Sequence, residues 1–269
     1  MKNGDNNGVL TLWEHLDVLR GVLWRVLLVV VVLTVAAFCF KDTLFYVVLA
    51  PDNPDFITYR WLGFVSERVF GTEMAPFNVQ LINTQLAGQF MVHVRVSLYA
   101  AALLALPYVL YALFGFVSPG LYENERRFAS AFVFWGYLLF LLGVLLNYFI
   151  VFPLTFRFLG TYTVSSDVGN LINLTSYIDT LSILSIAMGL VFEIPLLCWL
   201  AAKAGILNAS IMVRYRRYAV VAVVVAAAII TPTSDAVTLF IVSAPMLLLY
   251  EAGIAIVRRT SAKAGRVAE

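Results

Sequence analysis

The sequence has few charged residues and few cysteines for its length. Only 13% of its 269 residues are charged and 62% are hydrophobic, whereas a soluble domain carries about a quarter charged residues. One domain interior could not bury so many apolar side chains, so lipid is the solvent that fits this composition. The two cysteines, Cys39 and Cys198, stand in apolar runs, which argues against a disulfide framework. We therefore expect an integral membrane protein.

Signatures of catalysis and cofactor binding are also missing from the sequence. Its two histidines, His15 and His93, are too far apart to form a metal-ligand motif. It contains no Gly-rich phosphate loop, nucleophile elbow or dinucleotide fingerprint. The first apolar run starts late and follows several acids, which does not match a cleavable signal peptide. We expect no metal, no cofactor, no nucleic-acid binding and no enzymatic activity.

What the sequence does contain is a series of long apolar runs. A spanning helix needs about 20 apolar residues, because each residue rises about 1.5 Å across a hydrocarbon core of about 30 Å. The predicted spans are 21–40, 96–117, 128–151, 180–202, 218–230 and 236–257. The predicted fold class is therefore all-α, with short fifth and sixth helices and long external loops. The prediction treats 1–269 as a single six-helix membrane domain with flexible tails at 1–9 and 259–269.

Lysine and arginine set the predicted orientation, because cytoplasmic loops collect them. Most of the 18 basic residues fall on one side of the predicted spans: Lys2, Arg20, Arg25, Arg126, Arg127, Lys203, Arg214, Arg216, Arg217, Arg258, Arg259, Lys263 and Arg266. The other side keeps five, although its loops are far longer. Both termini and the loop between the second and third spans are therefore expected in the cytoplasm.

The long external segment 41–95 is rich in aromatic residues and punctuated by prolines such as Pro51. Tyr59, Trp61 and Phe64 stand there among polar residues. Two interpretations remain open. The aromatic residues form a belt on the outer leaflet, or the segment folds as a cap over the helix bundle.

The amino-terminal segment predicts an amphipathic helix, because leucines recur there at helical spacing. Glu14 and Asp17 fall on another face, three residues apart. This face is either a solvated acidic surface at the membrane boundary or a binding site for a cationic ligand.

The stretch SPGLYENERR, residues 118–127, joins the second and third predicted spans. Pro119 and Gly120 end the second span, and Glu123 and Glu125 precede the two arginines. A basic anchor with local ion pairs is one interpretation. The other is a recognition site, because a carboxylate at a membrane surface is well suited to a bidentate contact with an arginine.

Glu193 is an ionisable residue well inside the fourth predicted span. Such a group costs about 2.5–3.5 kcal/mol on insertion scales, so it should face the bundle interior or a wet cavity. It either satisfies the backbone carbonyl that Pro195 leaves free or belongs to a polar cavity used in transport. Asp235 is a candidate cap for the sixth helix.

Several segments together resemble the TatC family, the multispan receptor subunit of the twin-arginine protein translocase. They are HLDVLR (15–20), the Pro51 segment, FVSPGLYENERR (116–127), NYFIVFPLTFRFL (147–159), LVFEIPLL (190–197) and IITPTSD (229–235). The resemblance extends over about residues 12–257, and the second–third loop is its most specific part. It implies six spans with both termini inside.

The resemblance implies a receptor for signal peptides that carry two adjacent arginines. Its recognition surface combines the amino-terminal segment with the second–third loop, where Glu125 is the expected partner of a signal arginine. The residues expected to bind the signal peptide are Glu125, Asp17, Glu14, Phe116, Arg126 and Tyr122. The family's amino-terminal acid aligns with Val18, and Asp17 and Glu14 are the candidates to take its place.

The resemblance also implies partners and an energy source. Contacts with small single-span TatA/TatB-type subunits are expected at Glu193, Thr231, Pro232 and Asp235. The complex would be hetero-oligomeric, with several copies of this chain, in the bacterial inner membrane, and would export folded proteins using the proton-motive force. The alternative function is a secondary transporter or channel for a small solute, with Glu193 as its ion or proton site.

Overall fold

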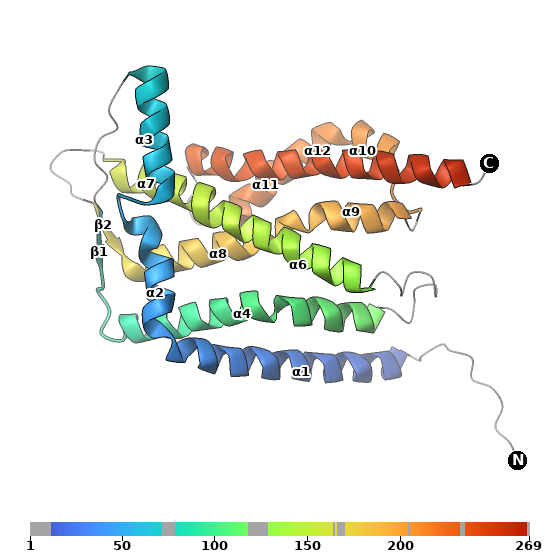
Figure 1. Cartoon of the computed structure of the whole chain (residues 1–269), viewed down its shortest axis with the longest axis horizontal. Helices are drawn as coiled ribbons and strands as arrows, with labels where there is room; N and C mark the ends of the chain where they lie inside the picture. Colours follow the sequence, from blue (N-terminus) through green and yellow to red (C-terminus); the bar gives the residue numbers. More distant parts are fainter. Residues whose placement is uncertain are drawn as a thin grey trace, which may run out of the picture. The chain divides into compact units, whose positions relative to one another are not determined.

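The computed structural model describes residues 12–71, 79–117, 129–163, 165, 170–203, 205–231 and 235–267, and helices make up most of these ranges (Figure 1). The chain divides into two compact units. Unit 1 comprises Met1–Phe40 and Ser97–Tyr137, and unit 2 comprises Lys41–Val96 and Leu138–Glu269.

Unit 1 is built on α1 (Leu12–Cys39) and most of α4 (Gly88–Val117), which lie side by side (Figure 1). Both helices are apolar over most of their circumference, as expected for segments that face lipid. Only 6% of the most apolar window of α1 is buried, so most of its surface remains uncovered by protein. The first turns of α6 (Ala129–Leu146) complete the unit.

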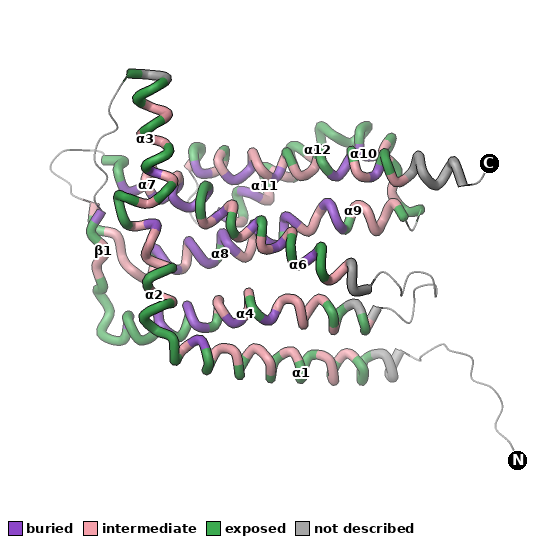
Figure 2. Tube along the Cα trace, in the orientation of Figure 1, coloured by how far each residue is buried: buried purple, intermediate pink, exposed green. Residues whose placement is uncertain are grey.

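Unit 2 has its core along α8 (Leu174–Phe192), where buried residues concentrate (Figure 2). Tyr177 is central: its ring meets those of Phe152 and Phe156 edge-on, at centroid distances of 5.0 and 4.9 Å. Pro195 cannot donate to the helical ladder, and the helix is interrupted at Glu193 before α9 (Ile194–Lys203) continues.

A π-helical turn, η3 (Asn147–Val151), joins α6 to α7 (Phe152–Thr161). Pro153 contributes to this turn, because it has no N–H to give to the carbonyl of Phe149. That carbonyl instead accepts a hydrogen bond from the Thr58 hydroxyl. Asn147, which is fully buried, donates to the Ser185 hydroxyl oxygen at 2.9 Å and so links η3 to α8.

At one end of unit 2, short elements pack across the helices. They are α2 (Lys41–Leu49), η1 (Ala50–Asp52), α3 (Ile57–Phe70), β1 (Gln80–Ile82) and β2 (Leu171–Asn173), with the two strands paired in parallel. Tyr177 donates its hydroxyl hydrogen to the carbonyl of Val48, and Tyr59 donates to that of Pro51, each at 3.0 Å. Pro51 is buried.

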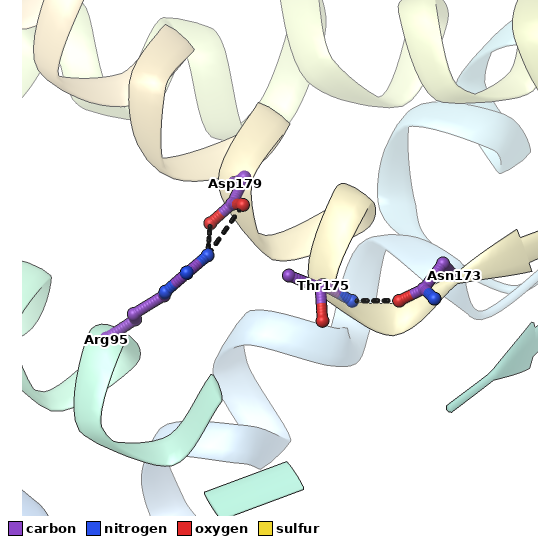
Figure 3. A network of polar contacts seen from close by, with 4 residues as sticks. All are labelled: Arg95, Asn173, Thr175 and Asp179. Atoms are coloured by element: carbon purple, nitrogen blue, oxygen red, sulfur yellow. Dashed lines mark hydrogen bonds and ion pairs between the residues drawn. The ribbon is translucent and has the colours of Figure 1, made fainter. Parts of the chain in front are cut away.

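The same end of unit 2 carries an ion pair between α4 and α8. Arg95 places Nη1 at 2.8 and 2.7 Å from the two carboxylate oxygens of Asp179 (Figure 3). The nearby amino end of α8 is capped by Asn173, which accepts from the backbone N–H of Thr175 at 2.8 Å. These polar contacts let charged residues extend the helices beyond their apolar runs.

The remaining helices of unit 2 are α10 (Ala209–Arg214), α11 (Arg216–Ile230) and α12 (Ala236–Val267). Asn208 caps α10 by accepting from the backbone N–H of Ser210. Tyr250 on α12 donates to the carbonyl of Met212 at 2.8 Å, and Arg216 pairs with Glu251 at 2.7 Å. These contacts attach α10 and α11 to α12.

Five helical segments of the described chain are long and apolar enough to cross a membrane. They are Leu16–Cys39, Gly88–Leu113, Phe132–Thr161, Leu174–Lys203 and Ala236–Thr260. The fifth predicted span, 218–230, is a helix too, but α11 has only 15 residues. The prediction of a short sixth helix is wrong, since α12 has 32 residues. Its last turns contain arginine, lysine and alanine, which are strong helix formers.

Candidate functional site

In unit 1, α1 and α4 enclose an open groove of about 550 Å³. The helices contribute five residues each: Asp17, Val18, Gly21, Val22 and Arg25 from α1, and Tyr108, Tyr111, Ala112, Gly115 and Phe116 from α4. On each helix these positions recur at helical spacing, so each wall is one continuous stripe.

The groove is open because small residues line it. A Cβ atom at Gly21 or at Gly115 would meet no neighbouring atom within 4 Å. Two tyrosines and Phe116 provide aromatic surface on the α4 wall, and the Tyr111 side chain is 65% exposed. The groove therefore offers apolar and aromatic contacts beside empty space, which suits an elongated apolar ligand.

Charge is placed at two points of the α1 wall. Asp17 and Arg25 are both exposed and lie on the same stripe, with Gly21 between them. Their separation of eight residues corresponds to about 12 Å along the helix axis. A cationic group would be favoured near Asp17 by a charge-assisted hydrogen bond, and aromatic rings nearby add cation–π attraction.

The structure brings together two of the residues that the sequence assigned to signal binding. Asp17 and Phe116 are separated by 99 positions in the chain, yet both line the groove. Glu14 lies in α1, within a turn whose side chains are not described. The other assigned loop residues, Pro119, Gly120, Tyr122, Glu125 and Arg126, lie outside the described residues.

Sequence reasoning missed Tyr108, Tyr111 and Arg25 as members of this groove. The tyrosines carried no spacing signal, because the five residues between Tyr111 and Phe116 turn about 140° around a helix. Arg25 was counted only as a cytoplasmic anchor. Its position four residues after Gly21 and eight after Asp17 was sufficient to place it on the same stripe.

Glu193 stands at the junction of α8 and α9 and is half-buried. Its Oε1 atom is buried and has no hydrogen-bond partner among the described residues. An acceptor of this kind inside a span is a candidate contact for a polar group of another helix.

The turn between α11 and α12 is described only at its ends. Asp235 accepts from the backbone N–H of Thr238 at 2.7 Å, which confirms the predicted helix cap. Thr231 is buried, and its hydroxyl has no hydrogen-bond partner in the part of the chain that the structure describes. Pro232 lies outside the described residues.

Two ionisable side chains next to η1 have shifted pKa values. Burial raises the pKa of Asp52, whose Oδ1 has no hydrogen-bond partner among the described residues. Burial also raises the pKa of Tyr59, against the opposing effect of the Arg157 guanidinium, which lies 5.7 Å from the centre of the Tyr59 ring. Within the described ranges, no three His, Cys, Asp or Glu side chains gather closely enough to hold a metal ion.

Comparisons with known proteins show the family and the fold. The model of the family described as "Sec-independent protein translocase protein (TatC)" matches residues 14–245. TatC of Blattabacterium sp. subsp. Periplaneta americana is 29% identical over 260 residues, covering 94% of this chain and 96% of the relative. TatC of Deinococcus radiodurans is 31% identical over 250 residues, covering 92% and 85%.

The fold is similar to that of a crystallised twin-arginine translocase receptor, TatC. The superposition has a TM-score of 0.72 at 27% identity and covers 92% of this chain and 99% of that one. A second crystal structure, of the receptor in DDM, gives 0.71 at 28% identity. Because a single family model matches most of the chain and the helical fold agrees over nearly its whole length, this chain belongs to the TatC family of Sec-independent protein translocase proteins.

Proposed function

We propose that this chain is the subunit that binds twin-arginine signal peptides, and that the groove of unit 1 is part of the binding site. The observation that carries the proposal is the meeting of Asp17 and Phe116 in one groove, from segments far apart in the sequence. The groove offers a carboxylate at the amino-terminal end of α1 and aromatic surface along α4.

The chemistry of recognition follows from the guanidinium group. Arginine is always charged and presents a planar fork that matches a carboxylate, whereas lysine offers only a point charge. Glu125 and either Asp17 or Glu14 supply the two counter-charges. Phe116, Tyr122 and Arg126 belong to the same surface, and the apolar part of the signal runs along the tyrosines of α4.

The proposed orientation places both termini, and therefore the groove's Asp17 end, in the cytoplasm. The excess of lysine and arginine on one side of the spans supports it. The chain would cross the bacterial inner membrane six times as one membrane domain. Helix α11 has 15 residues, and because a helix of that length extends only about 22 Å, it thins the bilayer or stops short of one face.

The signal receptor would work with small single-span TatA/TatB-type subunits and further copies of this chain. The unpartnered Glu193 Oε1 and the Thr231–Asp235 turn are the proposed contacts. No group in the groove makes or breaks covalent bonds, so the energy for export would come from the proton-motive force. A transporter for small solutes is not favoured, because family membership points to protein translocation.

The experiment that tests the proposal is equilibrium binding of a labelled twin-arginine peptide to the detergent-solubilised chain. Asp17→Asn, Glu14→Gln and Glu125→Gln each remove one candidate counter-charge. Losing a hydrogen bond to a charged group costs about 1.5–3 kcal/mol, so we expect the Kd to rise roughly 10- to 150-fold for Glu125→Gln and for one amino-terminal variant.

Asp42→Asn is the matched control, because Asp42 is an exposed carboxylate in α2 that does not line the groove. It should bind the peptide like the unaltered chain. A peptide with two lysines should bind weakly to every variant. Unchanged affinity in all three acid variants would overturn the assignment of these carboxylates.

A further inference from the structure

Helix α3 carries an exposed apolar stripe that no element of the described chain covers. Ile57, Trp61 and Phe64 follow one another at four- and three-residue spacing, so they lie on one face. Their side chains are 64%, 65% and 56% exposed. Three large apolar side chains at such exposure on one helix face indicate a surface that binds apolar material.

The opposite face of α3 is fixed to unit 2, so the direction of the stripe is set. Tyr59 is only 4% exposed, and its hydroxyl donates to the carbonyls of Pro51 and Pro153, at 3.0 and 3.3 Å. The Thr58 hydroxyl donates to the carbonyl of Phe149. With these bonds in place, α3 cannot rotate to bury its stripe against unit 2.

These anchoring contacts also place α3 at the level where the membrane ends. The contacts of α3 with Phe149 and Pro153 lie in the carboxyl-terminal half of the candidate span Phe132–Thr161, whose 30 residues exceed the about 20 that cross the hydrocarbon core. The Arg95–Asp179 pair belongs to the same end of unit 2 and is partly exposed, as expected of charges at headgroup depth.

Helix α3 runs across the direction of α8 and α12 and extends past them (Figure 1). A helix with this course at the end of membrane spans lies parallel to the bilayer surface. Arg60 is exposed beside the stripe, and Arg68 continues it, with its guanidinium carbon 5.3 Å from the centre of the Phe64 ring. Long basic side chains bordering an apolar face that contains a tryptophan are typical of helices at lipid interfaces.

We propose that α3 binds the bilayer surface itself, as an amphipathic helix embedded in the leaflet at that end of the spans. Ile57, Trp61 and Phe64 insert between the outer parts of the acyl chains, and Arg60 and Arg68 contact lipid phosphates. In the orientation proposed above this is the outer leaflet. Binding of lipid by α3 does not depend on that orientation or on signal recognition.

The test measures how deeply each face of α3 lies in lipid. The full chain, with Cys39 and Cys198 replaced by alanine, receives one cysteine at position 61, 64 or 67. Each cysteine carries a nitroxide label, in vesicles of phosphatidylethanolamine and phosphatidylglycerol. All three positions are exposed and therefore accommodate the label. Collisions with oxygen report lipid, and collisions with a water-soluble nickel complex report solvent.

We expect Trp61→Cys and Phe64→Cys to show a high ratio of oxygen to nickel collisions. Glu67→Cys, which lies about 120° around the helix from Trp61, is the control and should show a low ratio. Equal, nickel-dominated values at all three positions would place the stripe in water and overturn the proposal. Immobilised labels at 61 and 64, shielded from both reagents, would overturn it in favour of a protein partner such as a second copy of this chain.

Discussion

The glycines that line the groove of unit 1 have open space around them, whereas two glycines between α6 and α8 of unit 2 are tightly packed. In unit 1, a Cβ atom at Gly21 or Gly115 would meet nothing within 4 Å. In unit 2, a Cβ at Gly143 would lie 2.5 Å from the carbonyl oxygen of Met188, and one at Gly189 would lie 2.5 Å from the Phe140 ring. Gly143 and Gly189 of unit 2 permit close packing between α6 and α8, whereas Gly21 and Gly115 of unit 1 leave a groove open.

The fraction of buried residues differs between the two units in the same sense. The most apolar window of Leu174–Lys203 in unit 2 is 56% buried, against 6% for that of Leu16–Cys39 in unit 1 (Figure 2). Unit 2 therefore has the properties of a rigid scaffold, because tightly packed interiors tolerate few alternative arrangements. Unit 1 leaves most of its surface to lipid or to a ligand, which is what a receptor for an apolar signal requires.

The largest expected effect comes from closing the space at Gly143. Gly143→Ala forces the backbones of α6 and α8 apart, and overpacking of this kind costs about 1–3 kcal/mol of unfolding free energy. Gly115→Ala is the matched control and should be neutral or stabilising, since alanine is the better helix former. Thermal unfolding in detergent micelles measures both. Equal losses in the two variants would remove the contrast between the units.

A large side chain placed in the groove tests whether the open space in unit 1 is used for binding. Gly115→Leu places a large side chain in the groove without a clash, so the unfolding temperature should stay unchanged. The signal peptide must then overpack, which costs about 1–3 kcal/mol or roughly 5- to 150-fold in Kd. The binding assay with a twin-arginine peptide measures the change. Unaltered affinity would place the signal elsewhere.

The buried amide of Asn147 tests the polar interior of unit 2. Ser185→Ala removes the oxygen that accepts from Asn147 Nδ2 at 2.9 Å. Hydrogen bonds between membrane helices contribute about 0.6–1.7 kcal/mol, and we expect a loss of this size in thermal unfolding. Adding Asn147→Leu should recover part of it, because both partners are then apolar. Additive losses in the double variant would show that the two residues are not coupled.

A smaller effect is expected at the Arg95–Asp179 pair, whose side chains are 47% and 35% exposed. Exposed pairs contribute about 0.2–1 kcal/mol, and here a single nitrogen, Nη1, contacts both carboxylate oxygens. Arg95→Gln, Asp179→Asn and the double variant form a cycle whose coupling energy is read from unfolding curves. A coupling of zero would mean that the pair only satisfies solvation at the membrane boundary.

The smallest effect is a change with pH at Asp52. Burial raises the pKa of this carboxyl above its unfolded value, so its contribution to stability is full below the ordinary pKa of aspartate, about 3.9. That contribution is lost as the pH rises through the folded value. Asp52→Asn should therefore gain stability relative to the unaltered chain as pH increases. Parallel unfolding temperatures across the pH range would contradict this.

The sequence predicted the helical fold because apolar runs of spanning length have few alternatives. It placed the starts of two helices too late. Helix α4 begins at Gly88, where 96 was predicted, and α8 begins at Leu174, where 180 was predicted. Polar residues there, Arg95 and Asp179 among them, indicated loops, but they pair with each other. A pairing between distant segments cannot be recognised in one sequence without an alignment.

The sequence analysis missed two further features. The π-helical turn at Asn147 depends on Thr58 taking the carbonyl that Pro153 leaves free, which is a contact across 91 positions. The parallel pair of β1 and β2 is too short for a periodic signal. In the candidate site, Asp17 and Phe116 were identified through the family resemblance, whereas the contribution of Tyr108 and Tyr111 to the same wall required the structure.

The most direct test of the central claim is a crosslink between a signal peptide and the groove. A twin-arginine peptide with a cysteine in its apolar part is oxidised with a chain that carries either Ala112→Cys, in the groove, or Leu113→Cys. Leu113 is 45% exposed on the same helix but does not line the groove. We predict a disulfide at position 112 that excess twin-arginine peptide suppresses and a twin-lysine peptide does not, with little at 113. Equal crosslinking at both positions, or none at 112 while the peptide remains bound, would contradict the account.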